Sequence, residues 1–158
     1  MNFTQQATKL APVQSELEKQ KEIRSFAMKE LLKSVKNPKI AQKFKEFGCN
    51  AHFTMPNTNR NFTHSVHKKP NGALFVGEVD NVGVQNGYCI GVSADGNEII
   101  EAYFLNSHIE GYGRTIQLRE NDIIVICECR FSNSKIDGPA KIHFSDGTEW
   151  VGFFKNDS

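Results

Sequence analysis

The chain has 158 residues, of which 39% are apolar and 23% are charged, a composition typical of a globular protein with a single core. Its longest uncharged apolar run, residues 123–127, is far shorter than the roughly 20 residues that a membrane-spanning helix needs. The sequence therefore excludes a transmembrane protein. The first residues lack the basic and apolar regions of a secretory signal and resemble a mitochondrial presequence only faintly, so we expect an intracellular protein.

The net charge of +1 conceals an uneven distribution along the chain. Residues 1–70 carry 13 Lys or Arg against 5 Asp or Glu, whereas residues 71–158 carry 6 against 13. Because opposite charges attract, the two halves are expected to attract each other or to bind different partners.

Residues 12–37 predict one amphipathic helix, since neither Gly nor Pro occurs between Pro12 and Pro38. Gln20 and Arg24 interrupt its apolar stripe, which disfavours a coiled coil. The stripe consists of Val13, Leu17, Ile23, Phe26, Ala27, Leu31 and Val35. On the basic face, the candidates for contact with a protein partner or an anionic lipid are Lys29, Lys33 and Lys36.

A second helix is predicted to begin at Pro38, with Asn37 as its N-cap and Gly48 at its end. Its apolar face consists of Ile40, Ala41, Phe44 and Phe47. Together, residues 1–48 form a basic helical segment, which we expect to cover an end of the structure that follows.

Residues 49–70 form a polar, irregular connector, with one short strand expected at residues 62–66. The connector holds four candidate zinc ligands, Cys49, His52, His64 and His67. The alternative is that these histidines are ordinary surface residues, because structural zinc sites usually include at least two thiolates.

Cysteines are expected to be reduced, as in an intracellular protein. Cys127 and Cys129 are one residue apart in a β-like run and therefore project to the same face, where a disulfide between them would be strained.

From residue 71 onward the sequence consists of short alternating strands and turns. Turn dipeptides begin at residues 71, 95, 120 and 146, at spacings of 24, 25 and 26 residues. A second series, Gly87, Gly111 and Gly138, falls between these turns. Two interleaved series with the same period indicate an internal repeat.

The repeated unit has a turn Gly, an aromatic residue three positions later, a Gly two further on and a bulky residue two after that. This pattern resembles the MORN repeat, and the resemblance covers residues 71–158. The structural repeat positions that it identifies are Gly72, Phe75, Gly77, Gly87, Gly96, Phe104, Gly111, Gly113, Phe131, Gly138, Gly147, Trp150, Gly152 and Phe154.

The two middle units depart from the pattern. In the second unit, Ile99 or Ile100 takes the first position, Glu101 or Ala102 the Gly position, and Tyr103 or Phe104 the outer aromatic position. In the third unit these positions are taken by Cys127, Cys129 and Phe131. Because two glycines are missing, a β-bulge is expected in one of these units.

The resemblance implies an α+β protein in which the N-terminal helices precede a stack of about four antiparallel β-hairpins. A single hairpin cannot bury its apolar face, whereas stacked hairpins can, and Gly leaves room for an aromatic ring of the neighbouring unit. Phe75, Trp150 and Phe154 are therefore expected to lie mainly in the core rather than to contact a ligand.

The sequence contains no recognisable catalytic constellation or phosphate-binding loop, so we expect a non-enzymatic protein without a cofactor. The resemblance implies a scaffold or interaction subunit that binds protein partners in a larger assembly, such as the cytoskeleton or a cilium. One alternative is a module that binds anionic membrane surfaces. Another is an accessory subunit of a mitochondrial or nuclear enzyme complex. We expect neither sequence-specific nucleic-acid binding nor a small-molecule substrate.

Overall fold

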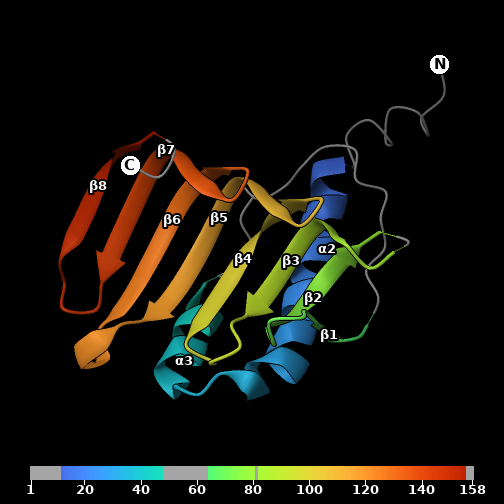
Figure 1. Ribbon diagram of the computed structural model, residues 1–158, viewed down its shortest axis with the longest axis horizontal. Helices are drawn as coiled ribbons and strands as arrows, with labels where there is room; N and C mark the ends of the chain where they lie inside the picture. The colour runs from blue at the N-terminus through green and yellow to red at the C-terminus, as the bar shows by residue number, and fades with distance from the viewer. Residues whose placement is uncertain (1–11, 48–63, 81, 156–158) are drawn as a thin grey trace.

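The computed structural model describes residues 12–47, 64–80 and 82–155, with side chains described from residue 16 onward. A short layer of helices lies against one face of a single antiparallel sheet (Figure 1). The predicted α+β class, with helices first and an antiparallel sheet after them, is confirmed.

The first helical segment consists of α2 (Pro12–Phe26), the π-helix η1 (Ala27–Leu31) and the 3-10 helix η2 (Leu32–Ser34). The single regular helix predicted for residues 12–37 is therefore wrong in its second half, where the pitch changes twice. The segment ends at Ser34, and Val35 is extended. Asn37 is also extended, as expected for the residue before Pro38.

The second helix, α3 (Pro38–Glu46), begins as the sequence predicts. The side chain of Asn37 accepts a hydrogen bond of 2.8 Å from the backbone N–H of Lys39, and Pro38 occupies the first turn. Ile40 and Phe44 are buried. Gly48, predicted to end the helix, lies outside the described residues.

The described residues form eight strands, and each strand pairs with the next along the chain in an antiparallel arrangement. They are β1 (His67–Lys68), β2 (Leu74–Val79), β3 (Gln85–Val92), β4 (Glu98–Leu105), β5 (His108–Leu118), β6 (Ile124–Ser132), β7 (Lys135–Phe144) and β8 (Glu149–Phe154). The short strand predicted at residues 62–66 is misplaced, because β1 begins at His67, which pairs with Phe75. Residues 62 and 63 lie outside the described part.

The turns at one end of the sheet have the backbone geometry that the turn residues predict. Gly72, Gly96 and Gly147 have φ values of 93°, 74° and 96°, in the left-handed region that Gly adopts without strain. The remaining turn contains the 3-10 helix η4 (Glu120–Asp122), in which Asn121 adopts a φ of 61°.

The helices pack on the face of the sheet that carries Val76, Ile90, Ile99 and Ile116, here called the helix face. Segments α2 and η1 contact β2 and β3, whereas α3 contacts β4 and β5. The expectation that the helices cover an end of the sheet is therefore wrong. The physical reason is that the apolar side chains at the centre of this face offer more area to bury than a sheet end does.

On the opposite face, small residues form a row across the strands. Each member is paired with the next: Gly77, Cys89, Ala102, Gly113, Cys129, Ala140 and Gly152. Beside this row, the second glycine series pairs with aromatic residues, as Gly87 with Phe104, Gly111 with Phe131 and Gly138 with Phe154. A strand Gly therefore stands directly opposite each of these rings.

The pairing also decides between the alternatives for the second unit. Ala102 belongs to the row of small residues, and strand alternation places Ile100 and Phe104 on the same face. Glu101 belongs to the other face, where it pairs with Ile90 and Arg114. Register shifts occur in β4 and β6, which belong to the two middle units, where a bulge was expected in one unit. A third shift, in β2 of the first unit, was not expected.

The aromatic residues are not equally buried. Phe75 is buried, as expected, but Trp150 is 42% exposed and Phe154 is half-buried. The core position expected for Trp150 is therefore wrong. Trp150 lies in β8, which has a neighbouring strand on one side within the described sheet, so less surface covers its ring.

Candidate functional site

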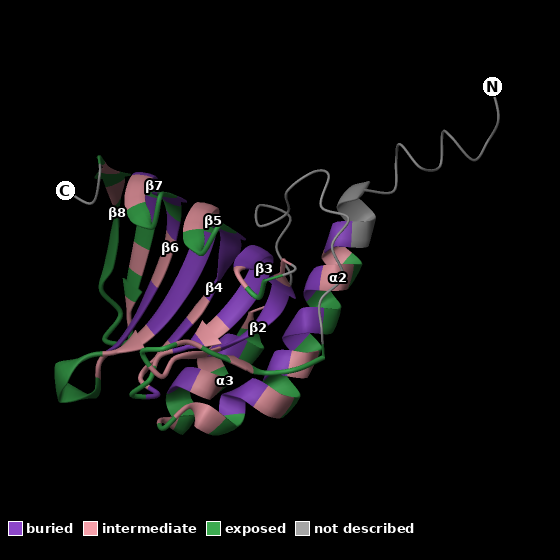
Figure 2. Ribbon diagram, turned by 45° about the vertical axis from the view of Figure 1, so that its right-hand side comes forward, coloured by how far each residue is buried: buried purple, intermediate pink, exposed green. Residues whose placement is uncertain are grey.

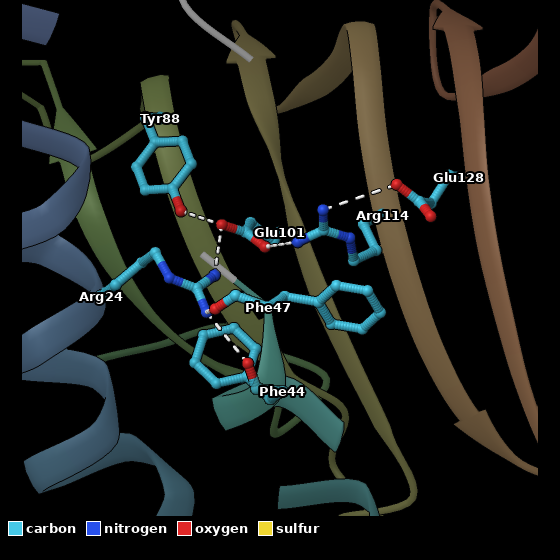
Figure 3. A network of polar contacts seen from close by, with 7 residues as sticks. All are labelled: Arg24, Phe44, Phe47, Tyr88, Glu101, Arg114 and Glu128. Carbon is cyan, nitrogen blue, oxygen red and sulfur yellow. Dashed lines mark hydrogen bonds and ion pairs between the residues drawn. The ribbon is translucent and has the colours of Figure 1, made fainter. Parts of the chain in front are cut away.

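The helix face contains a buried charged network centred on Glu101 of β4 (Figure 3). Its carboxylate accepts hydrogen bonds of 2.5 Å from Arg24 Nη1 and 2.9 Å from Arg114 Nη1. The hydroxyl of Tyr88 also donates to it. Glu101 is 1% exposed, so two cations and a hydroxyl compensate a carboxylate that water does not reach.

Arg24 links three elements of the protein. Its second terminal nitrogen, Nη2, donates to the backbone carbonyls of Phe44 at 2.9 Å and Phe47 at 2.6 Å. Its guanidinium lies 4.2 Å from the centroid of the Phe44 ring. Burial alone would lower the pKa of Arg24, but the carboxylate of Glu101 and the hydroxyl of Tyr88 outweigh burial and raise it. The network therefore fastens α2 and α3 to the sheet.

A second set of polar contacts joins the start of α2 to the sheet. Lys19 Nζ lies 3.2 Å from carboxylate oxygens of both Glu16 and Glu78. The hydroxyl of Tyr103 donates to Glu16, and the backbone N–H of Tyr88 donates to Glu78 at 3.1 Å. Burial raises the pKa of Glu78. These contacts, like those of Arg24, connect the basic half of the chain with its acidic half.

Neither network has the features of an active site. Glu101 and Arg24 are saturated with partners from the protein itself, and both are buried. A substrate would have to displace the contacts that hold the helices in place. The arrangement therefore explains how the helices are held, and the surfaces available to a ligand lie elsewhere.

One such surface is the part of the helix face that α2 and α3 leave uncovered, here called the uncovered end. It carries both charged and apolar side chains of β6, β7 and β8: Glu128, Arg130, Lys141, His143, Val151 and Phe153. Val151 is 68% exposed and Phe153 is 74% exposed. Figure 2 shows the contrast between the exposed β8 and the buried strands next to α2.

A cavity of about 330 Å³ adjoins the uncovered end, between α3 and the strands β6 and β7. It is lined by Lys39, Gln42, Lys43, Ile124, Ile126, His143, Ser145 and Gly147. The helix layer therefore stops beside a hollow with an apolar floor. Toward the edge of the sheet, His143 and Lys141 of β7 separate this hollow from Val151 and Phe153 of β8.

Strand β8 is itself an edge, since it pairs with β7 alone among the described strands. An edge strand presents unpaired backbone N–H and C=O groups, which can pair with another chain. Its sequence, EWVGFF, contains no Pro or Lys, the residues that commonly protect edges.

The candidate contact residues Lys29, Lys33 and Lys36 are exposed. Lys33 Nζ lies 3.1 Å from Glu30 of the same helical segment. The backbone N–H of Lys36 donates to the carbonyl of Gly96, which anchors the end of the segment to the turn between β3 and β4. All three residues are thus exposed to solvent.

The candidate zinc ligands are described in part. Cys49 and His52 lie outside the described residues. His64 Nε2 lies 3.2 Å from Glu22 of α2, whereas the ring of His67 stacks on Phe75 on the opposite face of the sheet. Within residues 12–47, 64–80 and 82–155, no group of three or more His, Cys, Asp or Glu is placed to hold a metal ion.

Cys127 and Cys129 both lie in β6, and they share a face as the spacing predicts. A hydrogen bond from the Cys129 thiol is the main reason that the pKa of Cys127 is lowered to about 7. Burial raises the pKa of the Cys89 thiol. Only the thiolate is strongly nucleophilic.

We therefore expect iodoacetamide to alkylate Cys127 before Cys89 and Cys129. The rate at Cys127 should rise as the pH passes through about 7, because its thiol loses its proton there. Quenched labelling from pH 5.5 to 9, followed by peptide mass mapping, measures each rate in the same sample. Labelling of Cys89 and Cys127 at equal rates would contradict the lowered pKa of Cys127. A labelling rate at Cys127 that does not rise below pH 8.5 would also contradict it.

The sequence pattern contained a signal for the network that the prediction did not use. Gln20 and Arg24 interrupt the apolar stripe of α2, yet both are buried on the sheet side. On β4, Glu101 stands between Ile100 and Ala102. Polar residues inside an apolar stripe indicate that the helix meets a polar partner where it packs, but they do not identify that partner.

No helix in the described ranges combines the length and the apolar character needed to cross a membrane. The sequence matches no protein-family model and no curated protein.

Proposed function

We propose that this chain is a non-enzymatic interaction subunit, which acts as a scaffold by holding a protein partner on the uncovered end of the helix face. The observation that carries the proposal is the exposure of Val151 and Phe153, at 68% and 74%, on a face whose other half is covered by helices. Large apolar side chains that gather on an exposed sheet face are typical of protein interfaces.

Two further features support a protein partner over a substrate. Glu101 and Arg24 are buried and bonded to groups of the protein itself, so they contribute rigidity rather than chemistry. The uncovered end combines exposed apolar groups with charges of both signs, such as Glu128 and Lys141. Interfaces commonly join an apolar centre to a polar rim.

The regular sheet also supports a scaffold role. Strands β2, β4, β6 and β8 begin at residues 74, 98, 124 and 149, nearly the same period as the turn dipeptides. Stacked units of this kind give an extended, rigid surface. The resemblance to MORN repeats is the reason for proposing a cytoskeletal or ciliary assembly as the setting.

The test is affinity capture from an extract of the native cell in mild salt, with the full chain as bait. We expect the wild type to retain a defined partner. The amount of partner recovered with Phe153→Ser should be at least about tenfold lower, since burying a Phe side chain contributes about 1.5–3 kcal/mol. Val82→Ser is the matched control, because Val82 is an 81% exposed apolar residue away from this surface.

The proposal fails if the partners of wild type and Phe153→Ser are the same in identity and amount. It also fails if the wild type remains a monomer that retains no protein, while circular dichroism shows it to be folded. Recovery that falls equally with Val82→Ser would indicate nonspecific apolar adhesion and would contradict a defined interface.

A further inference from the structure

A cavity of about 260 Å³ opens on the face of the sheet opposite the helices. Its apolar lining includes Phe75, Ile100, Phe104 and Ile109, from β2, β4 and β5. Two other lining residues, Lys69 and Gln85, bring polar groups to it. This volume is slightly below the usual range for small-molecule pockets, so the cavity suits one amino-acid residue rather than a nucleotide cofactor.

The cavity lies over Gly91, where a side chain is missing. Across this face, successive paired residues form a second row: His67, Phe75, Gly91, Ile100, Thr115, Cys127, Ile142 and Trp150. Gly91 is the one glycine among these described residues, and it stands between Phe75 and Ile100. The missing side chain therefore opens a hollow between two large apolar groups.

Folding does not require a glycine at position 91. Its φ is not among the left-handed values, and an added Cβ would lie 3.4 Å from the carbonyl oxygen of Leu74 and 3.7 Å from the Cβ of Phe75, which are acceptable contacts. By contrast, a Cβ at Gly77 would clash with the neighbouring strand. The hollow over Gly91 thus has no explanation in the packing of the sheet.

Gln85 contributes an unsatisfied acceptor to the cavity. The side chain is 3% exposed, and its Oε1 has no hydrogen-bond partner among the described residues. A buried acceptor without a donor costs about 1–3 kcal/mol, and a ligand N–H would remove that cost. A ligand that brings an N–H group to the Gln85 side chain would therefore gain affinity.

Lys69 contributes a positive charge to the lining of the cavity. Its Nζ lies 5.9 Å from the ring centroids of both Phe75 and Phe104. Burial and the Glu78 carboxylate raise the pKa of the Cys89 thiol, while Lys69 and the side chain of Gln85 both act against that rise. Both residues line the cavity.

We propose that this cavity binds the C-terminal residue of a protein partner. The apolar side chain would fill the hollow over Gly91, the terminal carboxylate would pair with Lys69, and the backbone N–H would donate to Gln85 Oε1. A C-terminal residue carries an apolar group, an anion and a donor around one Cα, which matches an apolar hollow lined by a cation and an acceptor.

The inference rests on the proposed function in taking a protein as the partner, but it concerns the other face of the sheet. The probe is an acetylated six-residue peptide of alternating Gly and Ser that ends in Leu, titrated calorimetrically into the full chain. The same peptide with a C-terminal amide is the first control. We expect the free acid to bind at least tenfold more tightly than the amide, because a hydrogen bond to a charged group contributes more than one to a neutral group.

Two variants test the cavity itself. Gly91→Val fills the hollow and Lys69→Gln removes the charge. Each substitution should therefore lower the affinity for the free-acid peptide at least tenfold. Lys68→Gln makes the same charge change on an exposed neighbour outside the cavity and should bind as the wild type does. Circular dichroism confirms that Gly91→Val is folded, and Lys69→Gln tests the site without any added volume.

No binding of the free acid at 5 mM overturns the inference, as does equal binding of acid and amide. Unchanged binding by both Gly91→Val and Lys69→Gln also overturns it. Phe153→Ser should bind the peptide normally. If Phe153→Ser loses its partner and the wild type does not bind the peptide, the proposed function is retained and this site is rejected. If Phe153→Ser keeps its partner and the wild type binds the peptide, this site is retained and the uncovered end is rejected.

Discussion

Replacing Glu101 by Gln is expected to lower the free energy of unfolding by about 3–5 kcal/mol, the usual cost of leaving buried charges without their partner. The substitution keeps the size of the side chain and removes the negative charge that compensates Arg24 and Arg114, which lie 2.5 and 2.9 Å away. Urea denaturation followed by circular dichroism measures the change. A loss of this size is a large part of the stability of a domain of this length.

Glu128→Gln is the matched control for this prediction. Glu128 also pairs with Arg114, at 3.5 Å, but its side chain is 39% exposed, so water screens the pair. We expect a loss below about 1 kcal/mol for this variant. Equal losses in the two variants, or a loss below about 1 kcal/mol for Glu101→Gln, would show that the network does not hold the helices on the sheet.

The second large effect is expected at Gly77. Its φ of 139° is one that residues with a Cβ rarely adopt, and it stands at the register shift of β2. An added Cβ would clash with the carbonyl oxygen of Tyr88 and would lie 2.7 Å from the Cα of Cys89. Gly77→Ala should therefore lose about 3 kcal/mol or more, from backbone strain and from displacement of β3.

Gly91→Ala provides the control in the next strand. Its backbone is not in the left-handed region and its Cβ would make ordinary contacts, so we expect a change within about 1 kcal/mol in either direction. The two variants change the same atoms in paired strands and are compared by urea denaturation. If Gly77→Ala proved as stable as Gly91→Ala, the close approach of β2 and β3 at this glycine would be wrong.

The turns and strands could be predicted from the sequence because their causes are local. A turn dipeptide sets its own backbone geometry, as Gly72, Gly96 and Gly147 show with their left-handed φ values. The cap of α3 is similarly local, since Asn37 bonds to an N–H two residues away. Alternation along each strand then determines which residues share a face.

The position of the helices could not be predicted, because it depends on contacts between residues far apart in the chain. Arg24 and Glu101 are 77 residues apart, and neither position alone indicates the other. The change of helical pitch at η1 also depends on distant contacts, since it occurs where Ala27 and Leu31 pack against the sheet. A helix placed on the sheet face rather than on its end leaves β8 exposed, and with it Trp150.

The uncovered end and the cavity over Gly91 also could not be predicted from the sequence, because both depend on the arrangement of the whole sheet. Val151 and Phe153 are exposed because the described helices contact β2 to β5 and not β8. The cavity over Gly91 arises from one missing side chain between two filled positions, which becomes visible when the strand register is known. Register and helix placement are properties of the whole sheet.

Site-specific photo-crosslinking in the native cell tests the central claim most directly. A benzophenone side chain replaces Phe153 in one variant and Val82 in a second, and both are irradiated in intact cells. If the uncovered end holds a protein partner, position 153 crosslinks to one recurrent protein that position 82 does not capture. Absence of a crosslink at 153, or the same crosslinked proteins from both positions, would contradict the claim.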